Sequence, residues 1–163
     1  ALRRQRQMCI RDSLKKENNI IFIRHAIAPG NGDPPNFDIL DCSTQRNLSK
    51  EGELQALKIG KFFKENDIKF TKVLSSEWCR CKDTAKIAFG NYETKNFLNS
   101  FYDERFSENK DKQILDFKKF IKNWNYSGNL ALVTHYVVIS EILDLATSSG
   151  EIIITNKNLE ILS

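Results

Sequence analysis

The chain contains two histidines, and each stands two positions after the last residue of an apolar run. His25 follows residues 20–23, and His135 follows residues 130–133. Continuous apolar runs of this length are typical of strands buried inside a parallel sheet. Because parallel strands end at the same edge of a sheet, where such folds bind their ligands, we expect the two imidazoles to lie close together in a crevice.

Two arginines are predicted to join this pair. Arg24 directly precedes His25, and Arg80 falls in the first turn of a predicted helix, from which its side chain should lean back toward the same sheet edge. Arginine forks bind phosphate oxygens, and a neutral imidazole can attack phosphorus. Neighbouring cations keep an imidazole unprotonated. One histidine in such a place is usually structural, but the set of four predicts a phosphoryl-transfer site that requires no metal.

The segments that position these residues alternate between strand and helix. A loop holding all three prolines follows His25 and runs to about Leu48, a length that is usually functional. Ser49 is predicted to cap a helix that ends near Asn66, with its apolar stripe at helical spacing. Residues 70–74 are predicted to form a strand, and Ser75 or Ser76 to cap the helix that carries Arg80 and stops at Gly90.

The second half of the chain continues the alternation. We expect a short strand within residues 92–98, a polar stretch over residues 99–112, a helix whose apolar stripe spans residues 114–124 and a strand over residues 129–134. A closing helix with its stripe at Val138, Ile142 and Leu145 and a terminal hairpin of residues 151–155 and 159–162 should follow. This pattern predicts a three-layer α/β/α fold with a mostly parallel central sheet.

Composition narrows the class of protein. With 163 residues, 40% hydrophobic and 28% charged, the chain fits one globular domain, and no apolar run approaches the roughly 20 residues of a membrane span. The formal charge is +4, of which the first twelve residues contribute +3, so the remainder is nearly neutral and gives little support for nucleic-acid binding.

Residues 1–13 lack an initiator Met and hydrophobic periodicity, and residues 8–12 resemble a translated sequencing-library end. We therefore interpret 1–13 as a non-native scar and 14–163 as the domain, which leaves cytoplasmic and periplasmic or secreted locations open.

Three cysteines lie within the domain. Cys42, Cys79 and Cys81 make a poor zinc-binding set, since both histidines are expected elsewhere. They are interpreted either as buried thiols or as a disulfide that joins Cys42 to Cys79 or Cys81.

Several short motifs resemble those of the histidine phosphatase superfamily, in its phosphoglycerate-mutase-like branch. Residues 23–26 (Ile-Arg-His-Ala) resemble its R-H-G signature, and residues 133–135 (Val-Thr-His) its third motif. The second motif is matched by residues 74–76 together with Arg80 and residues 84–85, and the helix opening at residues 47–49 with Gly52, Gln55 and Ala56 also fits. The resemblance runs from about residue 20 to residue 154 with the motifs in the right order.

This resemblance implies a transient phosphohistidine on His25, with Arg24, Arg80 and His135 binding the phosphoryl group and no cofactor. Arg46 is a candidate further member of the phosphate pocket. A carboxylic acid would protonate the leaving oxygen, for which Glu104 is the first candidate and Asp103 the second. Ala26 replaces the usual glycine, which is tolerable if its φ is negative.

The function predicted first is a phosphomonoester hydrolase acting on a phosphorylated small molecule or phosphoprotein. A phosphomutase and a protein phosphohistidine phosphatase of the same family are alternatives, although mutases usually carry longer insertions. A non-catalytic protein that binds a phosphorylated ligand is the alternative from another class, but it would not need both imidazoles.

Overall fold

A computed structural model describes residues 12, 18–125 and 127–163, so that almost all of the proposed N-terminal scar lies outside the described residues. Five strands form one sheet in the order β3-β2-β4-β1-β5. The pairs β1–β4, β4–β2 and β2–β3 are parallel, whereas β5 runs antiparallel to β1. The mostly parallel sheet is therefore confirmed. Its strands are β1 (Ile20–Arg24), β2 (Phe70–Ser75), β3 (Glu93–Thr94), β4 (Asn129–Thr134) and β5 (Ile152–Thr155).

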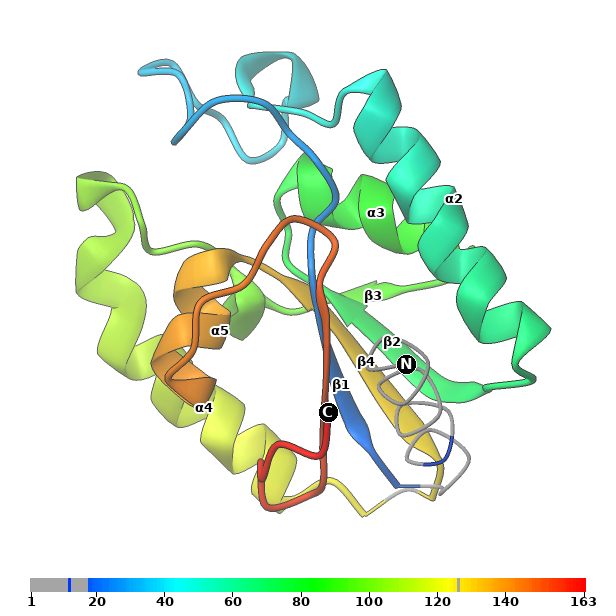
Figure 1. The fold of residues 1–163 in the computed structure, drawn as a ribbon. Coiled ribbons are helices and arrows are strands. Elements are labelled where there is room, and N and C mark those ends of the chain that lie inside the picture. Colours follow the sequence, from blue (N-terminus) through cyan, green and yellow to red (C-terminus); the bar gives the residue numbers. More distant parts are fainter. Residues whose placement is uncertain (1–11, 13–17, 126) are drawn as a thin grey trace.

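Helices cover both faces of the sheet, which confirms the three-layer α/β/α fold (Figure 1). On one face lie α2 (Lys50–Glu65) and α3 (Cys79–Phe89), and on the other lie α4 (Lys110–Lys122) and α5 (Tyr136–Leu143). Three short 3-10 helices occupy the connections: η1 (Cys42–Thr44), η2 (Asn96–Leu98) and η3 (Glu104–Asn109). The long loop after β1 lies beyond the carboxyl end of that strand, at the top of Figure 1.

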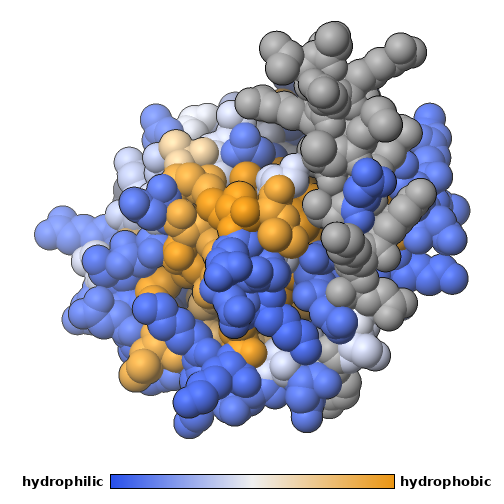
Figure 2. All heavy atoms as spheres, turned by 60° about the horizontal axis from the view of Figure 1, so that its bottom comes forward, coloured by the Kyte–Doolittle hydropathy of each residue, from blue (hydrophilic) through white to orange (hydrophobic). Residues whose placement is uncertain are grey.

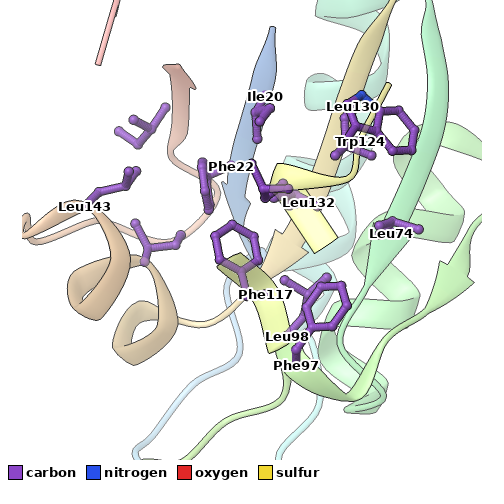
Figure 3. Packing of buried hydrophobic residues seen from close by; sticks show 13 residues of the cluster. Ile20, Phe22, Leu74, Phe97, Leu98, Phe117, Trp124, Leu130, Leu132 and Leu143 are labelled. Atoms are coloured by element: carbon purple, nitrogen blue, oxygen red, sulfur yellow. The ribbon is translucent and has the colours of Figure 1, made fainter. Parts of the chain in front are cut away.

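The central strands are buried on both faces because their side chains alternate between two cores. Ile20 and Phe22 of β1 face α4, where the Phe22 and Phe117 rings lie 5.9 Å apart (Figure 3). Ile21 and Ile23 belong to the core under α2 and α3. Each such side chain contributes roughly 1.5–3 kcal/mol by its burial. Two cores thus hold the strands that carry Arg24, His25 and His135 at their ends.

Three predicted elements differ from those observed. The short strand keeps only Glu93–Thr94, because the apolar residues after it enter the core from a 3-10 helix instead. The closing helix ends at Leu143, since Asp144 takes a left-handed conformation with φ 54°. The terminal hairpin is reduced to one bridge between Thr155 and Ile161, and β5 pairs mainly with β1.

The predicted serine cap of α3 is wrong. Trp78 stands at the N-cap position without a side-chain cap bond. The Ser76 hydroxyl accepts a hydrogen bond from the Trp78 backbone N–H but lies 2.8 Å from Nε2 of His135. Ser75 donates to the carbonyl of Ser76 instead of capping the helix. Ser76 thus orients a site residue.

A disulfide joins Cys42 of η1 to Cys79, the first residue of α3, whose Cα atoms lie 5.7 Å apart. Cys81 keeps a free, buried thiol. Of the two pairings left open by the sequence, the structure has Cys42–Cys79, which attaches the long loop to the start of the helix that carries Arg80.

Figure 2 views the molecule more from the amino ends of β1 and β4, where hydrophobic residues gather among hydrophilic ones. The two histidines lie at the carboxyl ends of the same strands, so this surface takes no part in the candidate site. Within the described part of the chain, no helix is both long and apolar enough to cross a membrane.

Candidate active site

The imidazole of His25 is held in one tautomer at the end of β1. Its Nδ1 lies 2.8 Å from the carbonyl oxygen of Ala26. A carbonyl only accepts, so Nδ1 carries the proton and Nε2 keeps its lone pair. The residue is 3% exposed, and burial, followed by the charge of Arg80, lowers the pKa of His25 to about 3. Nε2 is therefore an unprotonated nitrogen at neutral pH.

The turn after His25 is fixed by two helices. Thr84 of α3 accepts a hydrogen bond from the Ala26 N–H at 3.0 Å, and Gln55 of α2 accepts one from the Ile27 N–H at 3.0 Å. A Cβ at Gly52 would collide with the carbonyl of Ile27, so glycine is required for this close approach. Ala26 is not among the described residues with positive φ, and it is fully buried. Alanine therefore fits in place of the usual glycine.

Arg80 points from the first turn of α3 into the site, as the helix geometry predicts. Its Nε donates to Nε2 of His25 at 3.3 Å. Its Nη1 donates to both carboxylate oxygens of Asp33, at 2.9 and 3.2 Å. The residue is 3% exposed. A buried guanidinium thus lies directly against the lone pair of His25.

His135 faces His25 across the site, with the ring centroids 5.5 Å apart. Its Nε2 contacts the hydroxyl of Ser76 at 2.8 Å and the sulfur of Cys81 at 3.5 Å. Nδ1 lies 4.0 Å from the same sulfur. Burial, followed by the charge of Arg80, holds the pKa of His135 well below its usual range. The second imidazole is neutral as well.

Arg24 and Arg46 border the same space from two sides. Arg24 donates through Nη1 to the carbonyl of Thr147, and its guanidinium lies 5.3 Å from the ring centroid of Tyr136. Arg46 donates through Nε to the carbonyl of Gly32 at 2.7 Å and through Nη1 to the carbonyl of Ala28. Arg46 therefore also fastens the loop that follows His25.

The structure brings these five predicted side chains to one cavity of about 140 Å³, smaller than the roughly 300–1,000 Å³ of sites that enclose a drug-sized ligand. They are Arg24, His25, Arg46, Arg80 and His135. Tyr136 and Val137, which begin α5, also line it, so the positive end of that helix dipole faces the same space. The cavity is suited to a small, strongly negative group such as a phosphoryl group.

The two candidates for the acid that would protonate the leaving oxygen, Glu104 and Asp103, differ in their position relative to the cavity. Glu104 begins η3 with an exposed side chain and is not among the lining residues of the cavity. Asp103 lines the cavity, but Arg105 donates to it through Nε and Nη2, each at 2.9 Å. These hydrogen bonds lower the pKa of Asp103 to about 2. Glu104 is therefore placed outside the cavity, and Asp103 is ionised at neutral pH.

The family profile described as histidine phosphatase superfamily (branch 1) matches residues 20–111, more than half of the chain. The chain belongs to the histidine phosphatase superfamily. The match covers β1 with His25, the long loop and α3 with Arg80. No curated protein matches the sequence.

Solved structures share the fold of this superfamily member at low identity. A proposed alpha-ribazole-5'-P phosphatase from Escherichia coli is 16% identical with a TM-score of 0.64, covering 88% of this chain and 94% of its own. The protein histidine phosphatase SixA, complexed with tungstate, is 12% identical with a TM-score of 0.59, covering 88% and 92%. Phosphoglycerate mutase from Thermus thermophilus is 14% identical with a TM-score of 0.58, covering 89% and 96%.

The buried histidine predicts an acid-sensitive fold for this superfamily member. The pKa of His25 is 6.5 when unperturbed and about 3 in the folded protein, so the unfolded state binds more protons below pH 6.5. The free energy of unfolding should therefore fall as the pH drops from 6.5 toward 3, at about 1.4 kcal/mol per pH unit from His25 alone. Urea unfolding at neutral and acidic pH measures this slope. His25→Asn should show a shallower slope, and equal slopes for the two proteins would contradict the assignment.

Sequence reasoning missed the polar residues that hold this superfamily site together. Asp33 is indistinguishable by sequence from any solvated aspartate in a loop rich in proline and glycine. The sequence predicts a helix cap at Ser75 or Ser76, and Asn99, whose side-chain oxygen accepts from Ser76 at 3.2 Å, falls in a stretch expected to be merely polar. The one usable signal for Asp33 was the unusual length of its loop.

Proposed function

We propose that this protein is a metal-independent phosphomonoester hydrolase that works through a phosphohistidine on His25. The observation that carries the proposal is the lone pair of His25 Nε2, fixed by the carbonyl of Ala26 and placed beside Arg80 in a cavity lined by two further arginines. A fixed, neutral imidazole among cations has what attack on a phosphate ester requires.

In the first step Nε2 attacks phosphorus, and the bond from phosphorus to the leaving group breaks with its electron pair going to that group. Arg80, whose Nε donates to Nε2 of His25 at 3.3 Å, would donate to an oxygen of the phosphoryl group instead. Arg24, Arg46 and His135 would contact the remaining oxygens. The proton stays on Nδ1 of His25 and remains hydrogen-bonded to the carbonyl of Ala26, which stabilises the positive charge that forms on the ring.

In the second step water attacks phosphorus, the P–N bond breaks, and its electron pair returns to Nε2. Inorganic phosphate leaves, one proton goes to solvent, and His25 is neutral again. Deep burial disfavours the imidazolium form, which keeps the regenerated nitrogen unprotonated for the next cycle.

Because the carboxylates of the cavity are ionised, we expect the protein to act fastest on substrates with good leaving groups. Within the described part of the chain, Asp33 and Asp103 are the acids that line the cavity. Burial would raise the pKa of Asp33, but the charge of Arg80 and hydrogen bonds lower it, and hydrogen bonds from Arg105 lower the pKa of Asp103. Neither is protonated at neutral pH, so an alkoxide would leave without a proton donor. An imidazole, with a pKa of about 6.5, needs no such acid. This observation favours a second candidate function, hydrolysis of phosphohistidine on a protein, which is also the activity named for SixA.

The test compares leaving groups on the wild-type protein. We expect turnover of aryl phosphates and of a phosphohistidine peptide, with alkyl phosphates slower by about 100-fold or more, which is the contribution a missing acid would make. Rapid quenching with radiolabelled substrate should trap acid-labile phosphate on the protein. Binding of phosphate without label or hydrolysis would favour the non-catalytic alternative, and faster transfer than hydrolysis would favour a mutase.

Glu104→Gln is the matched variant for the acid. Because the Glu104 side chain is exposed outside the cavity, we expect the same rates as wild type on aryl and alkyl phosphates. A selective loss on alkyl phosphates would show that Glu104 reaches the leaving oxygen and would restore it as the acid.

A further inference from the structure

Asp33 carries a buried carboxylate in a cavity that three arginines also line. Its side chain is 6% exposed and that of Arg80 4%, and the two form an ion pair at 2.9 Å. Oδ1 also accepts from the Arg46 backbone N–H at 3.0 Å, and Oδ2 accepts from the Trp78 indole N–H at 3.1 Å. Both oxygens are therefore occupied by donors from three different residues.

This arrangement fixes the plane of the Arg80 guanidinium. Asp33 holds Nη1, and His25 accepts from Nε, so two of the three guanidinium nitrogens have assigned partners. The third, Nη2, makes no hydrogen bond to any residue that the structure describes, so it is free to bind a phosphoryl oxygen. A guanidinium is planar and rigid, so holding one nitrogen directs the other two.

Asp33 is poorly suited to give a proton. Burial alone would raise the pKa of its carboxyl, but Arg80, the Arg46 N–H and the Trp78 indole together lower it. The facing groups are cations or hydrogen-bond donors, and all of them favour the charged carboxylate. An acceptor that stays charged can hold an arginine in place but cannot protonate a leaving group.

We propose that Asp33 is the positioning residue of the site, which holds Arg80 in the orientation that presents its guanidinium to His25 and to the phosphoryl group. The proposal rests on the proposed function for its catalytic consequence. Asp33 also has a cost, because its negative charge opposes that of a bound phosphoryl group. Asp33 therefore lowers the affinity of the site for the anion, while it fixes the orientation of Arg80.

The first test is Asp33→Asn, which keeps the shape but places an NH2 group against Arg80 or Trp78, both donors. We expect kcat on an aryl phosphate to fall about 10- to 100-fold, the cost of misplacing a catalytic group by about an ångström. Tungstate, measured by calorimetry, should bind at least as tightly as to wild type because one negative charge is gone. A purely structural role would lower the folded fraction without separating kcat from tungstate affinity, and that result would overturn the proposal.

Asp38→Asn is the matched control. Asp38 lies on the same loop, is exposed and is not among the residues that line the cavity, so the substitution removes the same charge without touching Arg80. We expect kcat within threefold of wild type. An equal loss in both variants would show that the charge of the loop, and not the contact with Arg80, matters, and would overturn the proposal.

A double-mutant cycle asks whether Asp33 acts through Arg80. In the Arg80→Ala background, Asp33→Asn should change kcat by less than threefold, because the guanidinium that Asp33 holds is absent. The same 10- to 100-fold loss in both backgrounds would overturn the proposal.

Tungstate binding separates failure of this proposal from failure of the proposed function. If wild type binds tungstate but shows no turnover, the proposed hydrolase is wrong. In that case the double-mutant cycle is measured by the affinity of each variant for tungstate. Non-additive effects of Asp33→Asn and Arg80→Ala on this affinity would support the role of Asp33, and additive effects would overturn it. Absence of tungstate binding to wild type would overturn both.

Discussion

Replacing His25 by alanine is expected to lower kcat on an aryl phosphate by about 10⁴-fold or more. The variant lacks the nitrogen that would carry the phosphoryl group, so acid-labile phosphate should also be absent after rapid quenching. Both measurements use the same radiolabelled substrate. The arginines remain, and tungstate should still bind.

His25→Asn is the control for packing. Asparagine fills part of the buried space and can still donate to the Ala26 carbonyl, which accepts from Nδ1 in wild type. It has no basic nitrogen and should be as inactive as alanine. Turnover above one hundredth of wild type in either variant, or labelled phosphate on either, would show that the nucleophile lies elsewhere.

Replacing Arg80 by alanine is expected to lower kcat/KM by about 100- to 1,000-fold, or about 3–4 kcal/mol of transition-state stabilisation. The guanidinium is buried and lies 3.3 Å from the proposed nucleophile, so water cannot replace its charge. The loss should appear on good and poor leaving groups alike, because Arg80 is proposed to bind the phosphoryl group and not the leaving group. Steady-state kinetics on paired substrates measures both effects.

Lys86→Ala is the comparison for Arg80. Lys86 lies exposed in the last turn of the same helix, so its loss removes one positive charge far from the cavity. Its kcat/KM should stay within threefold of wild type. If Arg80→Ala also stays within threefold, Arg80 takes no part in binding the phosphoryl group.

The convergence of the site could be predicted because it follows from topology. His25 and His135 end neighbouring parallel strands, β1 and β4, which pair from Ile20 with Leu130 to Arg24 with Thr134. Their apolar runs are long enough to be recognised as buried strands. Arg80 followed from the direction in which helical side chains lean. None of these inferences needed knowledge of the loops.

The loops could not be predicted, for physical reasons that particular residues illustrate. Asp33 meets Arg80 across 47 residues of sequence, and no local pattern encodes that contact. Cys79 and Cys81 are two residues apart, so their side chains point to different sides of a helix, and only the path of the loop decides which faces Cys42. Phe97 and Leu98 have strand-like composition, yet they fill the core from a 3-10 helix.

The disulfide between Cys42 and Cys79 makes the geometry of the cavity depend on the redox state of its surroundings. It attaches the loop directly beside Arg80, the next residue along the chain. Disulfides of this kind persist outside the reducing cytosol, as in the periplasm or at the cell exterior, and their closure of a long loop removes freedom from the unfolded chain. A thiol reductant would release this tether, so reducing agents in a purification buffer would free the loop from the start of α3, beside Arg80.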